Sequence, residues 1–214
     1  MRLPIAKQLR KKTQSEVAYL QDEVVDIMYS VSDDLILHGG TAIWRCYAGK
    51  RFSEDLDFYS QSFTELISVF QREIDSHGLT LSKFKDTGNV IFSNVSNGSV
   101  SVKVEINHVS DVSGTQMPYE LADGSSIEIL SLTPDQFIKE KILAYSNRRY
   151  IRDLYDIYHL VNSSDLLETT RQELMEFMEN LQPPADEHVL KTIVYSGLPP
   201  SLDSLKRGIM RGIG

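Results

Sequence analysis

The order of hydrophobic and polar positions divides the chain into a helical start, a strand-rich middle and a helical end. An apolar stripe at helical spacing predicts a helix over 15–31, and Thr13 and Glu16 are spaced as a capping box at its start. The stripe consists of Val17, Leu20, Val24 and Ile27. A short apolar strand over 35–38 then runs into a pair of glycines. The next predicted elements are a helix at 41–47, a strand at 55–59 and a helix at 62–76.

The middle of the chain has the composition and the turn signals of a β-sheet. Segments rich in Val, Ile and Phe are separated by Asn-Gly, Ser-Gly and Asp-Gly pairs, and they predict an antiparallel or mixed sheet. These strands cover 80–86, 89–95, 99–108 and 127–132. Thr133, Pro134 and Gln136 then form a strong helix start. Helices follow at 134–147, 150–162, 169–181 and 186–195. The pattern therefore predicts an α+β domain over 1–132 and an all-helical domain over 133–214.

Composition narrows the class of protein. With 41% hydrophobic and 24% charged residues in 214, the chain is typical of a globular protein and not of a disordered one. No apolar run is long enough for a membrane span, the N-terminus lacks the pattern of a signal peptide, and Cys46 is the only cysteine, so we expect a cytoplasmic protein that does not bind membranes. The net charge of −8 argues against nucleic-acid binding over the whole surface. Positions 139–152, however, hold five basic residues against one acid, so they form either a local polyanion site or a solvated helix face.

The first chemical signal is the pair Gly39 and Gly40, between the predicted strand and the next helix. Such a turn leaves backbone N–H groups free to bind phosphate oxygens, and the helix N-terminus favours negative charge. Thr41 either adds a hydroxyl group to this site or caps the helix. A Gly-Gly pair by itself is usually only a turn.

A second signal is a set of three carboxylates. Asp55 and Asp57 are two residues apart on a predicted strand, so both side chains point to the same face. In 99–108 the apolar residues alternate with polar ones, and this places Glu105 on the polar face of its strand. If the two strands are neighbours, the three acids are suited to hold divalent metals for in-line attack on a phosphate. The alternative is a group of solvated acids on an exposed sheet face.

These motifs together resemble one protein family. Gly39-Gly40-Thr41-Ala42, a spacer and Arg51-x-Ser53-x-Asp55-Leu56-Asp57-Phe58 closely resemble the first motif of the AbiEii nucleotidyltransferases. These are toxins of type IV toxin–antitoxin and phage-defence systems, within the DNA polymerase β-like superfamily. The segment 139–160 resembles the family's later Lys…Arg-x-x-Asp-x-Tyr-Asp motif. The resemblance spans about 36–160 and includes no motif in the last 50 residues.

The resemblance implies a nucleotidyltransferase-type mixed sheet flanked by helices, and a role for each matching residue. Gly39, Gly40 and Ser53, with Thr41 as a further candidate, would contact the nucleotide triphosphate. Asp55 and Asp57 would bind Mg²⁺, with Glu105 as the third acid. Lys141 and Asp156 match later-motif residues on which activity depends, and Lys141 would also contact the triphosphate. The chain is shorter than many members, and Ile43 replaces the family's usual Leu.

The pattern of the helical end bears on two of these residues independently. Lys141 lies in the middle of an apolar helical arc, where an ammonium group either extends to the surface or reaches a negative group. The arc comprises Phe137, Ile138, Ile142, Ala144 and Tyr145. Asp156 lies one turn from Arg152 on the polar side of its predicted helix, so an ordinary surface ion pair is the simpler interpretation.

The resulting hypothesis is a Mg²⁺-dependent transfer of NMP from an NTP to an acceptor hydroxyl group. The resemblance implies an RNA acceptor, most plausibly a tRNA 3′ end near the patch at 139–152, growth inhibition, and a cognate antitoxin. Two alternatives stay open: transfer to a protein or small molecule, and a non-catalytic nucleotide-binding module. The acidic surface slightly favours transfer to a protein or small molecule, whereas the three retained acids argue against a non-catalytic module.

Overall fold

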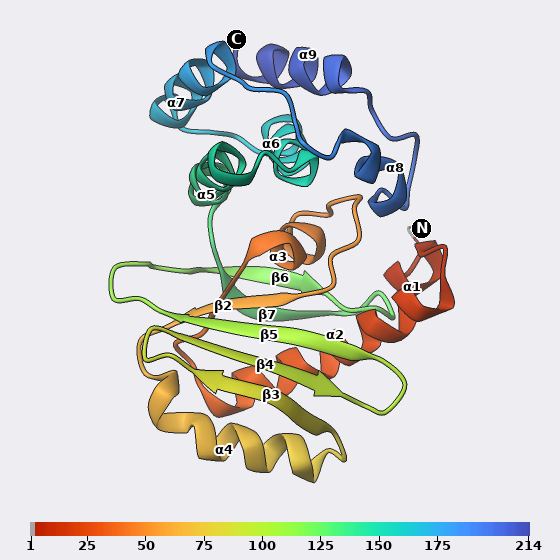
Figure 1. Ribbon diagram of the computed structural model, residues 1–214, viewed down its shortest axis with the longest axis vertical. Coiled ribbons are helices and arrows are strands. Elements are labelled where there is room, and N and C mark those ends of the chain that lie inside the picture. The colour runs from red at the N-terminus through yellow and green to blue at the C-terminus, as the bar shows by residue number, and fades with distance from the viewer. Residues whose placement is uncertain (1–2) are drawn as a thin grey trace. The chain divides into compact units, whose positions relative to one another are not determined.

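The computed structural model describes residues 3–214, apart from the side chains of 63–65, and it divides the chain into two compact units (Figure 1). The first comprises Met1–Cys46 and Phe52–Leu132, and the second comprises Tyr47–Arg51 and Thr133–Gly214. The first unit holds a mixed sheet with helices, and the second holds helices. This confirms the predicted fold class. Residues 47–51, which the sequence pattern places in the first domain, group with the second unit.

The first unit is built on a seven-stranded sheet with the order β3-β4-β5-β2-β1-β7-β6. Its strands are β1 (Ile36–His38), β2 (Leu56–Ser60), β3 (Thr80–Asp86), β4 (Val90–Ser96), β5 (Ser101–His108), β6 (Thr115–Glu120) and β7 (Ser126–Ser131). The pairs β2–β5 and β1–β7 are parallel and the other pairs are antiparallel. Strand β6 was not predicted. It contains Pro118 and lacks a clean apolar alternation, which suits a strand at the edge of a sheet.

Alternation along β5 divides the sheet into a buried and a polar face. Val102, Val104 and Ile106 are at most 3% exposed, whereas Lys103 and Glu105 point to the other face. The buried side chains belong to the same core as helix α2 (Lys12–Val31), which packs against β5 and α4 (Phe63–Ser76). The core therefore lies on one side of these strands, and the polar side carries the predicted acids.

Two shorter helices complete the first unit, α1 (Ile5–Gln8) and α3 (Gly39–Cys46). The predicted capping box at Thr13 and Glu16 is wrong, because α2 already begins at Lys12. There the side-chain oxygen of Gln14 accepts a hydrogen bond from the backbone N–H of Lys11.

The second unit contains α5 (Pro134–Arg148), α6 (Ile151–Ser163), α7 (Glu168–Glu179), the 3₁₀ helix η1 (Glu187–Val189), α8 (Leu190–Ile193) and α9 (Leu202–Ile213). The predicted start of α5 is confirmed: the Gln136 N–H donates to the Thr133 hydroxyl oxygen, and the Thr133 N–H donates to the Gln136 side-chain oxygen. Helix α9 was not predicted. No helix in the described part of the chain has the length and hydropathy of a membrane span.

Candidate active site

The backbone of the Gly-Gly turn lies next to Asp57, one of the predicted acids. Strand β1 ends at His38, whose Cα pairs with that of Asp57, and α3 begins at the next residue. Gly39 has a φ of 73°, and a Cβ atom at this position would lie 2.4 Å from the Asp57 Oδ2 atom. Only glycine fits here, because any side chain would meet the carboxylate and strain the backbone. The start of α3 and Asp57 are therefore adjacent parts of one site.

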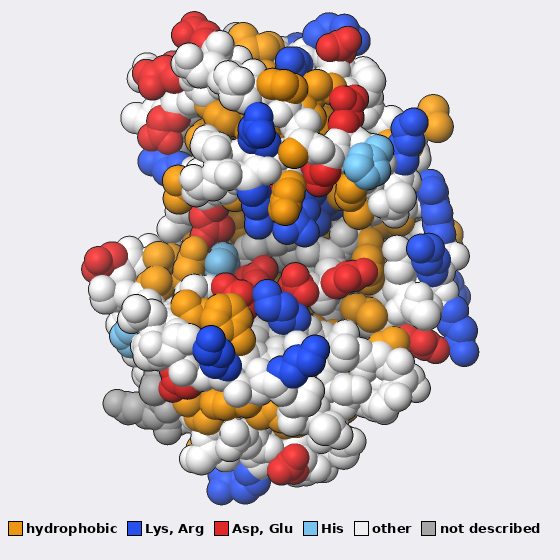
Figure 2. Space-filling model, viewed as in Figure 1, with side chains coloured by type: hydrophobic (Ala, Val, Ile, Leu, Met, Phe, Trp, Pro, Cys, Tyr) orange, Lys and Arg blue, Asp and Glu red, His pale blue; other side chains and the backbone are white. Residues whose placement is uncertain are grey.

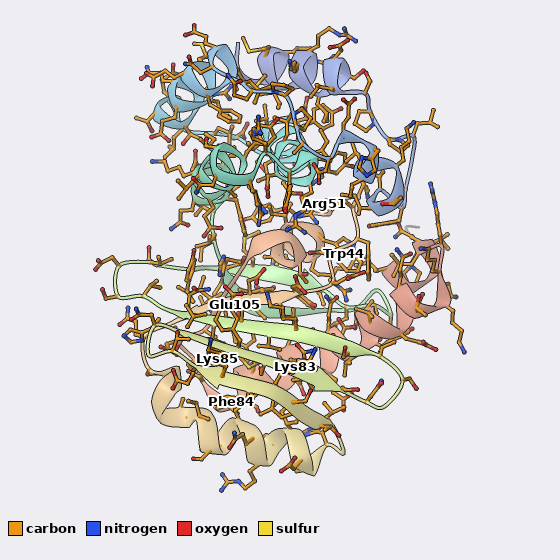
Figure 3. All side chains as sticks on the ribbon, in the orientation of Figure 1. Trp44, Arg51, Lys83, Phe84, Lys85 and Glu105 are labelled. Carbon is orange, nitrogen blue, oxygen red and sulfur yellow. The ribbon has the colours of Figure 1, made fainter. Side chains whose placement is uncertain are left out.

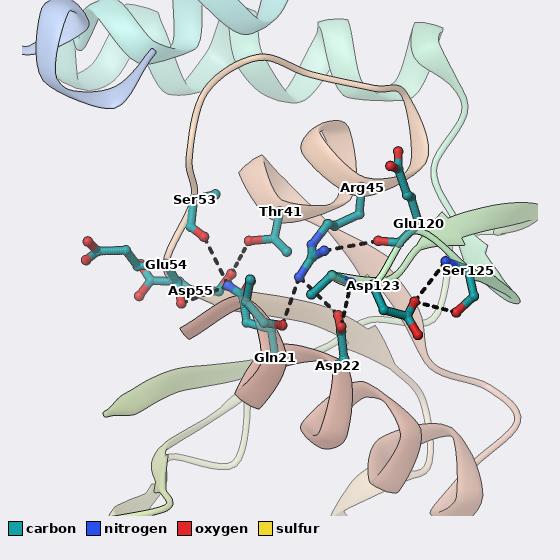
Figure 4. Close-up of polar contacts among 12 residues, drawn as sticks. Gln21, Asp22, Thr41, Arg45, Ser53, Glu54, Asp55, Glu120, Asp123 and Ser125 are labelled. Carbon is teal, nitrogen blue, oxygen red and sulfur yellow. Dashed lines mark hydrogen bonds and ion pairs between the residues drawn. The ribbon is translucent and has the colours of Figure 1, made fainter. Parts of the chain in front are cut away.

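The backbone of residues 53–55 is fixed by two buried side chains (Figure 4). The Thr41 hydroxyl on α3 donates to the Asp55 carbonyl oxygen at 2.5 Å. The Gln21 amide on α2 donates to the carbonyl oxygens of Ser53 at 3.0 Å and Glu54 at 3.1 Å. Thr41 is fully buried, so its side chain positions the Asp55 segment in this structure. The sequence analysis did not identify Gln21. Its position among the apolar residues of α2 is a signal, because a buried amide needs hydrogen-bond partners.

Helix α3 is anchored by Arg45, a second residue that the sequence analysis missed. Its guanidinium donates to the carbonyl oxygens of Ala18 (2.9 Å) and Glu120 (3.1 Å) and pairs with Asp22 at 3.0 Å (Figure 4). Burial raises the pKa of Asp22 to about 6, although the charge of Arg45 acts in the opposite direction. These contacts hold the glycine turn from the far end of its helix.

Two of the predicted acids lie side by side on neighbouring strands. Asp57 on β2 and Glu105 on β5 are directly paired in the parallel register, so their side chains share one face of the sheet. Figure 3 labels Glu105 over the strands of this sheet. The strand adjacency that the sequence left open is therefore present. The Asn107 amide donates to Glu105 Oε1 at 3.3 Å and orients this carboxylate from the same strand.

Lys103 lies on the same strand as Glu105 and forms an ion pair with it. Its ammonium lies 3.2 Å from Glu105 Oε2. Partial burial lowers the pKa of Lys103, but the hydrogen bond and charge of Glu105, followed by the charges of Asp55 and Asp57, raise it above its ordinary value overall. Figure 2 shows acidic side chains gathered beside Lys and Arg side chains over the strands of the sheet. The charges of Glu105, Asp55 and Asp57 thus all act on the Lys103 ammonium.

The donor chemistry of this face fits a divalent cation held together with a phosphate. Mg²⁺ prefers carboxylate oxygens and commonly takes only one or two from the protein, the rest coming from water and substrate phosphates. The pair Asp57 and Glu105 meets that need. Within residues 3–214, where side chains are described, no group of three His, Cys, Asp or Glu residues is arranged to hold a metal ion. The set of Asp55, Asp57 and Glu105 as metal ligands therefore stays a prediction.

The later motif lies in the second unit as a buried ionic cluster. Arg51 forms two hydrogen bonds of 2.6 Å with the two oxygens of Asp156, and both residues are almost fully buried. The Lys141 ammonium lies 2.9 Å from Asp156 Oδ2 and 3.4 Å from Asp153 Oδ1. Arg148 donates two hydrogen bonds of 2.8 Å to Asp153. We call these five residues the ionic cluster.

The ionic cluster changes the interpretation of both later-motif residues. The surface ion pair expected between Asp156 and Arg152 is wrong, because Asp156 is 1% exposed and pairs with Arg51 and Lys141. Burial acts to raise the pKa of Asp156, but the two cations outweigh it and hold that pKa below its ordinary value. Lys141 does reach negative groups, and both are carboxylates of α6. Its predicted contact with a triphosphate stays a prediction that requires the ammonium to leave them.

The basic patch at 139–152 is largely neutralised by acids of its own unit. Lys141 is buried, Lys139 pairs with Glu173 at 3.2 Å, and Arg148 pairs with Asp153. The guanidinium groups of Arg148 and Arg152 lie over the ring of Tyr150, at 5.3 and 5.4 Å from its centroid. The patch therefore offers less free positive charge than its sequence indicates.

Comparison with known proteins adds a family and a fold. A family model described as the nucleotidyl transferase AbiEii toxin of a type IV toxin–antitoxin system matches residues 27–182. Among solved structures, JHP933 from Helicobacter pylori is similar with a TM-score of 0.65 and 19% identity, over 92% of this chain and 90% of that one. An H. pylori structure titled as a candidate nucleotidyltransferase is similar with a TM-score of 0.60 and 19% identity, over 91% of each chain. No curated protein matched.

Proposed function

Because the chain belongs to the AbiEii family of nucleotidyltransferase toxins, we propose that it transfers a nucleoside monophosphate from an NTP to a hydroxyl group of RNA, with a tRNA 3′ end as the acceptor. Membership of a type IV toxin–antitoxin family implies nucleotidyl transfer and an antitoxin counterpart. The observation that carries the site is the register of Asp57 and Glu105 on parallel strands, beside a helix start that only glycine permits. The RNA acceptor rests on the resemblance of the motifs, and a cytoplasmic location rests on the composition of the chain and its single cysteine.

In this proposal, the triphosphate lies at the start of α3. The backbone N–H groups at Gly39 and Gly40 face an anion, and the hydroxyl group of Ser53 adds a donor from the segment that Gln21 holds. Thr41 contributes indirectly, because its hydroxyl group is engaged with the Asp55 backbone. The phosphate groups therefore meet fixed donors that need no rearrangement, which is the basis of electrostatic preorganisation.

Asp55, Asp57 and Glu105 hold Mg²⁺ in this proposal, together with oxygens of the triphosphate. When bound, the ion would neutralise charge on the phosphates and lower the pKa of the acceptor hydroxyl group. The acceptor hydroxyl group loses its proton to water, and its oxygen forms a bond to the α-phosphorus while the bond from that phosphorus to the α–β bridging oxygen breaks, so that pyrophosphate leaves. Before the ion binds, Lys103 balances part of the charge of the acids through its pair with Glu105.

We assign Lys141 and Asp156 a positioning role. Asp156 fixes Arg51 through two hydrogen bonds, and Arg51 precedes Asp55 by four positions in the chain. The ionic cluster thus restrains one end of the segment that contains Ser53 and Asp55. Activity would depend on both residues even though each is bound within the second unit.

The test is the transfer of α-³²P label from each NTP to total RNA, with Mg²⁺ or with EDTA. Label on a tRNA-sized band that requires Mg²⁺, and that Asp57→Asn abolishes, is the expected result. Asp165→Asn, the same change at an exposed aspartate, should retain the label. Label on protein alone would overturn the RNA acceptor, and no label with any NTP would overturn the proposal as a whole. Equal growth inhibition by wild type and Asp57→Asn would contradict the toxin role of the site.

A further inference from the structure

Helix α9 lies beyond residues 27–182, which the family model matches, and it lines a groove together with Tyr158 of α6. The groove has a volume of about 470 Å³ and is lined by Tyr158, Ser204, Arg207, Gly208 and Arg211. Ser204 and Gly208 are four residues apart, as are Arg207 and Arg211, so these four residues share one face of α9. A neighbouring stripe of Leu205, Ile209 and Ile213 is buried and fixes the helix in its unit. We call this feature the α9 groove.

Close packing at one glycine shapes the α9 groove. A Cβ atom at Gly208 would lie 2.2 Å from Tyr158 Cε2 and 2.7 Å from its Cδ2, so only glycine lets α9 approach the tyrosine ring on α6. The Asn162 amide donates to the carbonyl oxygens of Tyr158 at 2.7 Å and of Gly208 at 3.4 Å, which ties the two helices together. The walls of the groove are thus two packed helices rather than a loop.

The two arginines of the α9 groove differ from three other arginines of the same unit. Arg51 and Arg148 pair with buried aspartates, and Arg171 donates to the Gly212 carbonyl oxygen at 2.8 Å. Arg207 and Arg211 are exposed, and no partner for either guanidinium exists among the residues whose side chains are described. They lie one turn apart, so their like charges repel each other unless an anion lies between them. Positions 201–214 hold three basic residues and one acid in a chain of net charge −8.

We infer that the α9 groove binds phosphate groups of an RNA chain. Guanidinium groups match phosphate oxygens in charge and in the geometry of their paired donors. The Ser204 and Tyr158 side chains add hydroxyl groups to the same groove. That the ligand is RNA rests on the proposed function, whereas the preference for phosphate follows from the groove itself. The groove would supply acceptor binding that the neutralised patch at 139–152 does not.

The test is RNA affinity in the absence of NTP, measured by filter binding of labelled tRNA between 50 and 200 mM salt. The full chain is compared with Arg207→Gln/Arg211→Gln and with Lys191→Gln/Lys206→Gln, which removes the same charge from the same unit outside the groove. We expect the arginine variant to lose at least tenfold in affinity and to lower the log–log salt slope by about 1.4, for two phosphate contacts at about 0.7 each. Both arginines are exposed, and equal thermal unfolding of the variants confirms that each is folded.

Each result decides between outcomes. An equal loss in the lysine variant would show a diffuse charge effect and overturn the groove. A second arm, equilibrium dialysis with ³²P-labelled inorganic phosphate, separates a site for free phosphate: binding that the arginine variant loses, with RNA affinity unchanged, would overturn RNA as the ligand. If label never transfers to RNA but the arginine variant loses RNA affinity, RNA binding by the groove is supported and the proposed reaction is overturned. If label reaches RNA and the arginine variant binds RNA with wild-type affinity, the reaction is supported and RNA binding by the groove is overturned.

Discussion

Asp156→Asn removes one negative charge from the ionic cluster while conserving the size of the side chain. Asp156 is 1% exposed and accepts two hydrogen bonds of 2.6 Å from Arg51 and a contact of 2.9 Å from Lys141. The substitution leaves two buried cations without this carboxylate, and removing one partner of a buried ion pair costs about 3–5 kcal/mol. For a chain of this size, we expect the Tm to fall by about 6–20 °C.

The assay is urea unfolding followed by circular dichroism, with Asp165→Asn as the matched control. Asp165 is exposed, so its variant should stay within about 0.5 kcal/mol of wild type. A double-mutant cycle with Arg51→Met should show coupling of at least about 1 kcal/mol, because the two residues contact each other directly. A loss below about 1 kcal/mol in Asp156→Asn would refute the reasoning.

The stability that Asp156 contributes depends on pH. The pKa of Asp156 is below its ordinary value in the folded chain, because Arg51 and Lys141 outweigh the effect of burial, which acts to raise it. Its contribution to stability is therefore present above the unfolded pKa and is lost as the pH falls through the folded one. Wild type should lose this increment in acid, whereas Asp156→Asn should lack it.

Three further substitutions test the first unit. Gly39→Ala should reduce transfer at least about tenfold and destabilise the chain by about 1–3 kcal/mol, since its Cβ would meet Asp57; Gly88→Ala, with a φ of 82° and open space around it, is the control and should keep its activity in the same label-transfer assay. Gln21→Ala should cost about 1–3 kcal/mol in urea unfolding, because two carbonyl groups lose their donor; unchanged stability would contradict that account. Burial raises the pKa of Asp22 to about 6 despite the charge of Arg45. Protonated Asp22 therefore adds about 3 kcal/mol to the free energy of unfolding below about pH 4, and this increment is lost as the pH rises through 6. Asp22→Asn should therefore flatten the pH dependence of unfolding in that range, and an identical profile would contradict the assignment.

Local spacing explains what the sequence predicted correctly. Local composition and turn signals located β3 at 80–86, and alternation placed Glu105 on the polar face of its strand, because both signals depend only on neighbouring residues. The Thr133 start of α5 is also local, since its two hydrogen bonds join residues three apart. The adjacency of β2 and β5 could be stated only as a condition, since residues 57 and 105 are joined by the sheet and not by the chain.

Long-range pairs explain what was missed. Arg51 and Asp156 are 105 positions apart, and no periodicity links them, so Asp156 had the pattern of a surface residue. Helix α9 was missed because Gly208 and Gly212 weaken its helical signal. Both glycines are required by tertiary packing: a Cβ at Gly208 would meet Tyr158, and one at Gly212 would lie 2.3 Å from Val161 Cγ1.

The division of the chain at residues 47–51 also governs how this protein can be recombined with its relatives. These five residues belong to the second unit, while Ser53 and Asp55, only a few positions later, belong to the first. A chimera joined at residue 132 would combine Arg51 from one parent with Asp156 from the other, and would function only where both parents keep that pair. A fragment of 133–214 alone would expose Asp156 without its guanidinium partner. Exchange of the helical unit between homologues therefore requires two transplanted segments, and the shorter of them interrupts the motif that carries the acids.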